Sequence, residues 1–461
     1  MTGRGTVDIS PPVHREMKDK LDRSVFHKTV EVLAVKVPPS KAGVVLKAEA
    51  MRGTIIDFPK TKSVMPTQDG ERLVLLRFGS EVELPEKARD FLASQAGPLQ
   101  KHSIEFDYDY WTADDILAAV LPEELVEGAP SGFATVGHMA HLNLNDEYLP
   151  YKYLIGEVIL DKNRHIRTVV NKINSIHTQF RFFQMELLAG EPDYIVEHHE
   201  SDCKFTFDFS KVYWNSRLHT EHGRLVDSFS REDVVADVFA GVGPFALPAA
   251  KKGCAVLAND LNPESYKYLK INIDNNKVDT LVRSFCEDGK DFIKSSVVRA
   301  LENPFPPPVV PVSRTQQLKA KKLAREQGVS QAQSSSPSAV NASENTGPSR
   351  SRITQYVMNL PDSAITFLGA FRGLLTSANA NGRDLSGVYD EDSSMPMVHC
   401  YCFSREAELD KAEVDIRQRV EEQLGDSLEA EVSIFHVRSV APNKEMYCIS
   451  FRLPRRIAFA P

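Results

Sequence analysis

The residues best suited to chemistry are carboxylates and an amide that follow short apolar runs. The stretch DVFAGVGPF, Asp237–Phe245, joins such a run to a glycine-containing turn, where the backbone can approach a ligand closely. It lacks the G-x-G-x-x-G spacing, so it does not indicate NAD. Asp260 ends the next apolar run about 20 residues later, which is the spacing at which a carboxylate meets ribose hydroxyls.

Two further polar turns continue this series. Asp288 and Gly289 in CEDG follow the strand-like TLVRSF, and Asn359 in MNLPD follows another apolar run. Because the ends of successive parallel strands face one crevice, we expect these side chains to meet there. Each turn taken alone is explained equally well as an ordinary strand exit. The ordered set Asp237, Asp260, Asp288 and Asn359 favours a site for a nucleoside-containing ligand.

Two motifs upstream carry charged groups. Arg217 and Glu221 lie in SRLHTEH, and such a pair is by itself typical of a surface contact. Arg181 lies among phenylalanines in FRFF, and the residues alone are explained equally by a helix whose arginine points into solvent. It belongs to a basic stretch, Asp161–Phe183, in which five cations accompany a single acid. That stretch is a candidate path for nucleic-acid phosphates, or else a solvated face.

The apolar pattern around these residues alternates between strands and helices. From Val234 to Val278 it runs strand, loop, helix, strand, loop, helix, which predicts an α/β domain with a doubly wound, mainly parallel Rossmann-like sheet. Smaller α+β domains precede it, and we expect domains at 1–130, 131–200 and 201–461. Between about 303 and 352 the periodicity vanishes in a Pro- and Ser-rich stretch, which predicts a disordered insertion in the last domain.

Composition limits the class of protein. The 461 residues are 42% hydrophobic and 26% charged, which excludes a collagenous, coiled-coil or wholly disordered chain. The net charge of −8 is the wrong sign for a protein coated in nucleic acid, so such a partner must meet a local basic surface. Six scattered cysteines without C-x-x-C spacing favour reduced thiols over zinc or disulfides. We find no apolar run near the ~20 residues of a membrane span and no clear cleavable signal.

The motifs together resemble one family. In order, FRxFxxExLAG, SRLxTEH, DVFAGVGPF, NDLNP, EDG and MNLPD are similar to those of eukaryotic and archaeal tRNA (guanine-37-N1) methyltransferases, with a fungal member expected. The resemblance runs from about residue 131 to the C terminus, outside the Pro- and Ser-rich insertion. It implies a class I methyltransferase fold that uses S-adenosylmethionine to methylate N1 of guanosine 37, beside the anticodon. That reaction is the first step toward wyosine where the pathway exists, and it supports reading-frame maintenance.

The resemblance also assigns roles, motif by motif. Arg181 matches the family's catalytic arginine, Glu221 its general base and Arg217 a further active-site arginine. Archaeal members often carry Arg where His222 stands, which changes the charge of that contact. The positions that match the family's S-adenosylmethionine contacts are His222, Asp260, Leu261, Asp288, Gly289 and Asn359.

The same resemblance sets expectations about partners and location. The N-terminal domain is expected to read the overall shape of tRNA. We expect a monomer that binds tRNA with guanosine at position 37, without metal and without a membrane. The cytoplasm and the mitochondrial matrix are its expected compartments, with the nucleus as a further one.

These roles match what N1 methylation of guanine demands. N1 carries a proton and is a poor nucleophile until that proton leaves, so a carboxylate such as Glu221 would take it. Negative charge then builds on O6, where a fixed guanidinium such as Arg181 stabilises the transition state more than the ground state. Lysine would serve less well because it lacks the planar fork. Bases of an anticodon loop can be splayed out and read on their Watson–Crick edge.

Two other functions stay open at this point. Related enzymes of wybutosine synthesis transfer the aminocarboxypropyl group of the same cofactor, and they typically carry a Gly-Asn pair where Ser216-Arg217-Leu218 stands here. The presence of that arginine favours methyl transfer. A catalytically inactive tRNA-binding module is the other possibility, and the intact Arg181, Glu221 and Asn359 argue against it.

Overall fold

The computed structural model describes residues 6–95, 97–130, 132–173, 184–308, 348–429 and 431–461. Its internal contacts divide the chain into two compact units, the first comprising Met1–Ile173 with Met185–Asp193 and the second Asn174–Gln184 with Tyr194–Pro461. The domain boundaries expected near residues 130 and 200 stay predictions. In the described ranges, no helix has the length and apolar character needed to cross a membrane.

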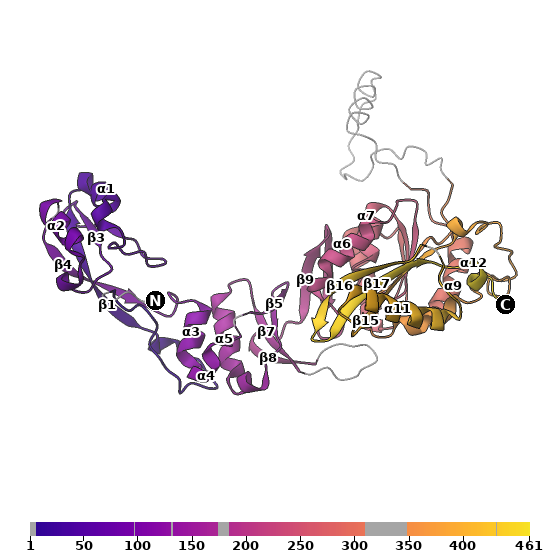
Figure 1. The fold of residues 1–461 in the computed structure, drawn as a ribbon, viewed down its shortest axis with the longest axis horizontal. Helices are drawn as coiled ribbons and strands as arrows, with labels where there is room; N and C mark the ends of the chain where they lie inside the picture. The colour runs from indigo at the N-terminus through magenta and orange to yellow at the C-terminus, as the bar shows by residue number, and fades with distance from the viewer. Residues whose placement is uncertain (1–5, 96, 131, 174–183, 309–347, 430) are drawn as a thin grey trace, which may run out of the picture. The chain divides into compact units, whose positions relative to one another are not determined.

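The first unit contains two small sheets with helices. One sheet has the strand order β2-β3-β1-β4 and the other β5-β6-β7-β8 (Figure 1). Thr112 caps α3 by accepting a hydrogen bond from the amide of Asp115, as the sequence pattern predicts. The elements are β1 (Lys28–Val37), α1 (Pro39–Lys47), β2 (Val64–Pro66), β3 (Arg72–Leu75), α2 (Glu86–Gln95), β4 (Leu99–Phe106), α3 (Ala113–Val120), α4 (Glu123–Val126), β5 (Ala134–Val136), β6 (Met139–Leu142), α5 (Lys152–Lys162), β7 (Thr168–Ile173) and β8 (Gln184–Gly190).

The second unit is built on a seven-stranded sheet of order β13-β12-β11-β14-β15-β17-β16. A separate hairpin precedes the sheet and is formed by β9 (Ile195–Glu200) and β10 (Cys203–Asp208). The strands from β13 to β15 in that order run parallel, and β17 is antiparallel to both of its neighbours. The strands are β11 (Val234–Asp237), β12 (Ala255–Asn259), β13 (Val282–Phe285), β14 (Gln355–Met358), β15 (Met397–Ser404), β16 (Ser433–Ala441) and β17 (Lys444–Arg452).

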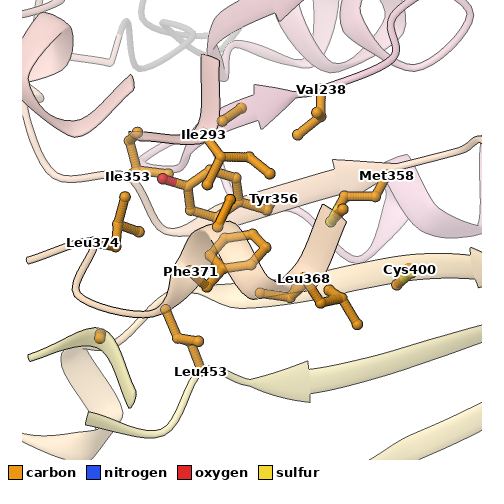
Figure 2. Close-up of a cluster of buried hydrophobic side chains, with 14 of the residues drawn as sticks. Val238, Ile293, Ile353, Tyr356, Met358, Leu368, Phe371, Leu374, Cys400 and Leu453 are labelled. Atoms are coloured by element: carbon orange, nitrogen blue, oxygen red, sulfur yellow. The ribbon is translucent and has the colours of Figure 1, made fainter. Parts of the chain in front are cut away.

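Helices cover both faces of this sheet. Figure 1 shows α6 and α7 on one side and α9 and α11 on the other. The α9 and α11 side encloses a core in which the rings of Tyr356 and Phe371 meet edge to face, 4.9 Å apart (Figure 2). The predicted α/β class with a mainly parallel sheet is confirmed. The helices are α6 (His219–Asp227), α7 (Ala246–Lys252), α8 (Pro263–Asn276), α9 (Gly289–Glu302), the 3-10 helix η6 (Ala364–Phe371), α11 (Leu409–Leu424) and α12 (Arg455–Ala458).

Two local interpretations of the sequence were wrong, and one strand was missed. The residues around Val212 are strand-like in type, but they do not form a strand, because the chain there turns after β10 and enters α6 through a short 3-10 helix. The alternative interpretation of Arg181, a helix across Asn171–Gly190, fails at both ends, since Asn171 lies in β7 and Gln184 begins β8; Arg181 itself lies outside the described residues. The sequence pattern also missed β16, whose mainly exposed side chains lack the clear alternation of a half-buried strand.

The expected insertion at 303–352 is shorter than the sequence suggests. Residues 309–347 lie outside the described residues, but the two flanks belong to the fold. Phe305 is fully buried and forms an antiparallel bridge with Arg350, whose two backbone hydrogen bonds measure 2.8 and 2.9 Å. The Arg350 guanidinium also donates to the carbonyl oxygens of Arg231, Gly253 and Pro306. The two flanks are therefore joined to each other by the bridge between Phe305 and Arg350.

Deletion of Gln316–Pro348 should leave both folding and catalytic activity intact, because the closing bridge and the buried Phe305 remain. We expect the melting temperature to stay close to that of the wild type and the rate to stay within about a factor of two, as for changes remote from packed features. Thermal melting and a methylation assay check this. Arg350→Ala is the matched control and should melt at lower temperature. A folded but inactive deletion would show that the insertion takes part in function.

Candidate functional site

The carboxyl ends of β11, β12 and β13 are tied together by one buried amide. Asn259, fully buried at the end of β12, donates from Nδ2 to the carbonyl oxygens of Val238, at 3.1 Å, and Glu287, at 3.0 Å. Its Oδ1 accepts a hydrogen bond from the amide of Glu287 at 3.1 Å. Because these bonds fix the exits of adjacent parallel strands, the polar residues that follow the strands share one edge of the sheet.

Asp260 follows directly and is oriented by two backbone amides. Its carboxylate accepts hydrogen bonds from Gly241 at 2.8 Å and from Asn262 at 2.9 Å. Gly241 has a φ of +56°, a conformation that glycine adopts without penalty in the turn after β11. Burial raises the pKa of Asp260, while these two amides oppose the shift. With a further hydrogen bond from the side chain of Ser265, the carboxylate still keeps acceptor capacity for a sugar hydroxyl, and the neighbouring Leu261 is 38% exposed.

The turn after β13 brings Asp288 and Gly289 against the same edge. Asp288 caps α9 by accepting a hydrogen bond from the amide of Lys290 at 2.8 Å. A Cβ at Gly289 would lie 2.9 Å from the ring of Phe239 and 3.2 Å from that of Phe367. The two rings meet edge to face 4.9 Å apart. Glycine is therefore required here for the α9 N terminus to approach this aromatic pair.

Two polar groups at the exits of β11 and β14 lack partners among the described residues. The Oδ1 atom of Asn359 is buried without a hydrogen-bond donor. Both carboxyl oxygens of Asp237 are likewise unpartnered, and its side chain is fully buried. Burial, with a smaller contribution from the charge of nearby Asp260, raises the pKa of Asp237 to about 8, although the backbone amide of Phe239 opposes the shift. Unsatisfied buried acceptors are unusual in a native fold, so they indicate a place for a donor-bearing ligand.

The buried Asp237 predicts a specific pH dependence of stability without ligand. An unfolded Asp loses its proton near pH 3.8 and the folded one near about 8, so the folded state binds more protons between these values. Stability should therefore fall as pH rises through this window. Because Asn stays neutral, the stability of Asp237→Asn should fall less steeply as pH rises. The difference in melting temperature between this variant and the wild type should therefore grow from about pH 5 to pH 8. Asp279→Asn, in an exposed turn, is the control; an unchanged slope in Asp237→Asn would contradict the assignment.

Glu221 on α6 is buried, and its carboxylate is heavily engaged. Arg224 donates to it in a bidentate pair, with Nε 2.6 Å from Oε2 and Nη2 2.7 Å from Oε1. The hydroxyl of Tyr401 on β15 donates to Oε1 at 2.7 Å. Three donors therefore occupy three of the roughly four acceptor positions of a carboxylate, which leaves one on Oε2. The ring of Tyr401 lies 5.7 Å from that of Phe245, so this motif reaches the start of α7, just beyond the β11 turn.

His222, the next residue on α6, lies deeper in the domain. Its Nδ1 contacts Oε1 of Glu200 at 2.6 Å, and its ring meets that of Phe245 edge to face at 4.8 Å. Burial alone would raise the pKa of Glu200, but hydrogen bonds with His198 and His222 outweigh it and lower the pKa to about 2. Glu200 therefore fixes the orientation of the imidazole ring beside the turn that follows β11.

The remaining predicted residues are less constrained. The side chain of Arg217 is exposed in the short helix before α6, and its backbone amide donates to Asn215. Arg181 lies outside the described residues. In the basic stretch, Lys162 lies over the ring of Tyr108 at 3.6 Å and Arg167 pairs with Asp193 at 3.1 Å. Both cations are engaged in contacts within the first unit, so fewer cations of this stretch are available to bind phosphates than the sequence suggests.

Comparisons with known proteins cover both units. Residues 113–193 match the TYW2 N-terminal domain, and residues 196–301 match the TRM5/TYW2 methyltransferase domain. A tRNA (guanine(37)-N(1))-methyltransferase of Coprinopsis cinerea is 58% identical, over 98% of this chain and 98% of its own length. The Schizosaccharomyces pombe protein of the same name is 45% identical at the same coverage. This chain belongs to the tRNA (guanine(37)-N1)-methyltransferase family.

Solved structures show a similar fold. Trm5b from Pyrococcus abyssi superposes with a TM-score of 0.55 at 22% identity, covering 91% of this chain and 98% of that one. The aTrm5 chain of the complex of aTrm5 and tRNALeu gives 0.57 at 20% identity, covering 92% and 100%. At these identities the likeness shows the fold alone, and it confirms the class I architecture expected from the sequence.

Some residues of this methyltransferase were missed by sequence reasoning. Asn259 stands in NDLNP, where a polar residue at the end of an apolar strand could have been noticed. Arg224 follows Glu221 by three residues on a helix, a spacing that favours an ion pair, whereas the expected pairing was with Arg217. Tyr401 gave no signal, because its contact with Glu221 spans 180 residues. Within the described residues, no cluster of His, Cys, Asp or Glu is arranged to hold a metal ion.

Proposed function

We propose that this chain transfers the methyl group of S-adenosylmethionine to N1 of guanosine 37 in tRNA. Membership of the family supports the reaction, and one feature of the structure carries the site. At a single sheet edge, the unpartnered Oδ1 of Asn359, the oriented carboxylate of Asp260 and the close approach at Gly289 form a cradle of mixed donors and acceptors. Such a cradle suits a nucleoside that carries an amino acid moiety.

The cofactor fits this set of residues. Asp260 is suited to the ribose hydroxyls, Leu261 and the turn at Asp288 and Gly289 to the adenine, and Asn359 with His222 to the methionine moiety. When bound, S-adenosylmethionine supplies an activated methyl group on a sulfonium. The chain itself contributes orientation and exclusion of water, since the strand exits are held rigid by Asn259.

Proton removal is the step that we assign to the protein. Glu221 accepts the N1 proton of guanine through its remaining acceptor position on Oε2, while Tyr401 and Arg224 hold the other positions. Arg181 stabilises the negative charge that develops on O6. Arg217, exposed beside the start of α6, completes the charged surroundings of the target base.

The mass of the product nucleoside tests this proposal. A tRNA transcript with guanosine 37 is incubated with labelled S-adenosylmethionine, digested and weighed, next to a transcript with adenosine 37. We expect one added methyl on the guanosine 37 transcript alone. An added aminocarboxypropyl group would indicate the wybutosine enzyme, and an unchanged nucleoside would indicate an inactive binding module.

The family resemblance also supports a proposed state and location. We propose a monomer that acts in the cytoplasm and the mitochondrial matrix, with the nucleus as a further compartment. Sedimentation of the purified chain tests the first point, and a dimer at micromolar concentration would overturn it. Fractionation of cells that express the tagged full chain tests the second.

A further inference from the structure

A row of side chains crosses the sheet beneath Glu221. Tyr401 on β15 pairs with Cys448 on β17, and Cys448 pairs in turn with Phe435 on β16. Directly opposed residues of antiparallel strands point to the same face, so the three side chains form one line. Helix α6 reaches both ends of this line, because Glu221 accepts from Tyr401 and the guanidinium of Arg224 lies 4.2 Å from the ring centre of Phe435.

Arg224 therefore contacts two partners at once. The fork of its guanidinium binds both oxygens of Glu221, while its plane rests on Phe435. The side chain of Glu221 is 4% exposed and that of Arg224 is 33% exposed, so the carboxylate is enclosed while the guanidinium reaches solvent. Phe435 is 44% exposed although it is large and apolar, and its contact with Arg224 explains why an aromatic residue stands at this exposed position.

Arg224 is also the cation that balances Glu221 among the described groups around it. Burial keeps the pKa of Tyr401 well above its ordinary value and raises that of Cys448 to about 12, so both remain neutral. Burial, with the charge of Arg224, lowers the pKa of His399 to about 3, which keeps this ring neutral as well. An enclosed carboxylate without a cation would favour its protonated form.

We propose that Arg224 is a positioning residue for Glu221, aligned by Phe435, which holds both oxygens of the enclosed carboxylate and aims its free Oε2 position at the substrate. This inference rests on the proposed role of Glu221 as base. The two contacts have different effects. The guanidinium of Arg224 supplies the positive charge and fixes both carboxylate oxygens, while the ring of Phe435 orients the guanidinium. Lysine in this place would supply the charge alone.

The test is the pH profile of single-turnover methylation with enzyme and S-adenosylmethionine in excess. In Arg224→Gln the low-pH limb should move up by about one pH unit or more, because the buried carboxylate has lost its cation. Its rate should then fall to as little as about a tenth of the wild-type rate on the acid side of the profile and should largely recover at high pH. Arg224→Lys should keep the wild-type limb with a lower plateau. Phe435→Leu should lower the plateau without moving the limb.

Matched measurements separate positioning from folding. Arg419→Gln removes another arginine that pairs with a carboxylate on its own helix, Asp415, and it should leave the profile unchanged. A uniform loss at every pH in Arg224→Gln, with a lower melting temperature, would make Arg224 structural and overturn the proposal, as would a wild-type profile. In the same assay, full activity of Glu221→Gln would instead refute the base, and no methylation by the wild type would refute the proposed function.

Discussion

Replacing Glu221 by Gln should slow methyl transfer by roughly a hundredfold or more, within the ~10²–10⁴ that a positioned general base contributes. Glutamine has nearly the same shape but cannot accept the N1 proton of guanine. Since that proton must leave before N1 becomes nucleophilic, the chemical step itself should slow. The loss should therefore appear in the single-turnover rate with tRNA and S-adenosylmethionine both saturating.

Cofactor binding should survive this substitution. Asp260 is held by two backbone amides, and Asn259 fixes the turn that leads to Gly289; Glu221 is bonded to none of these groups. The dissociation constant for S-adenosylmethionine, measured by calorimetry, should stay within about twofold of the wild type. Equal losses of rate and cofactor affinity would mean instead that Glu221 is a structural residue.

Glutamine disturbs the pair with Arg224, so a second variant is needed. The amide offers one acceptor where the guanidinium fork requires two. Tyr401→Phe removes one donor to Glu221 and leaves the ion pair intact. It should cost much less rate than Glu221→Gln if the proton-accepting role dominates. A comparable loss in both variants would place the importance of Glu221 in its hydrogen bonds.

The sheet could be predicted because its strands are buried on both faces. β11 and β12 read as continuous apolar runs, and every residue in them is buried. The polar residue after each run then locates the ligand edge, since parallel strands end on the same side. β16 escaped prediction for the opposite reason: it is an edge strand, and its exposed side chains are under little constraint from a core.

The contacts of the site could be predicted only in part. Asp260, Asp288 and Asn359 could be predicted to share one edge of the sheet because topology alone brings strand exits together. The network around Glu221 depends on the register between β15, β17 and β16, which determines that Tyr401 and Phe435 lie under one helix. Register is set by packing across the whole sheet and leaves no local trace in SRLHTEH. The proposed role of Glu221 was inferred from the resemblance to a family, whereas its hydrogen-bond partners could be identified only from the structure.

Replacing Arg181 should have the second large effect. The residue lies in the connection between β7 and β8, neighbouring strands of one sheet, and the family motif assigns it to catalysis. We expect Arg181→Ala to lower the saturated single-turnover rate by about 10²–10³, as for loss of one donor to a developing oxyanion. Arg181→Lys should recover part of this, because the charge returns without the planar fork.

The competing role for Arg181 is a phosphate contact, and salt dependence separates the two. Loss of a phosphate contact weakens tRNA binding and reduces the slope of log affinity against log salt by about one, while it leaves the saturated rate unchanged. Arg164→Ala, an exposed arginine of the same basic stretch, is the matched control and should show that pattern. If Arg181→Ala behaves like Arg164→Ala, the guanidinium of Arg181 contributes to tRNA binding and not to the chemical step. A lost rate with an unchanged salt slope would place it at O6, where charge appears only as the N1 proton departs.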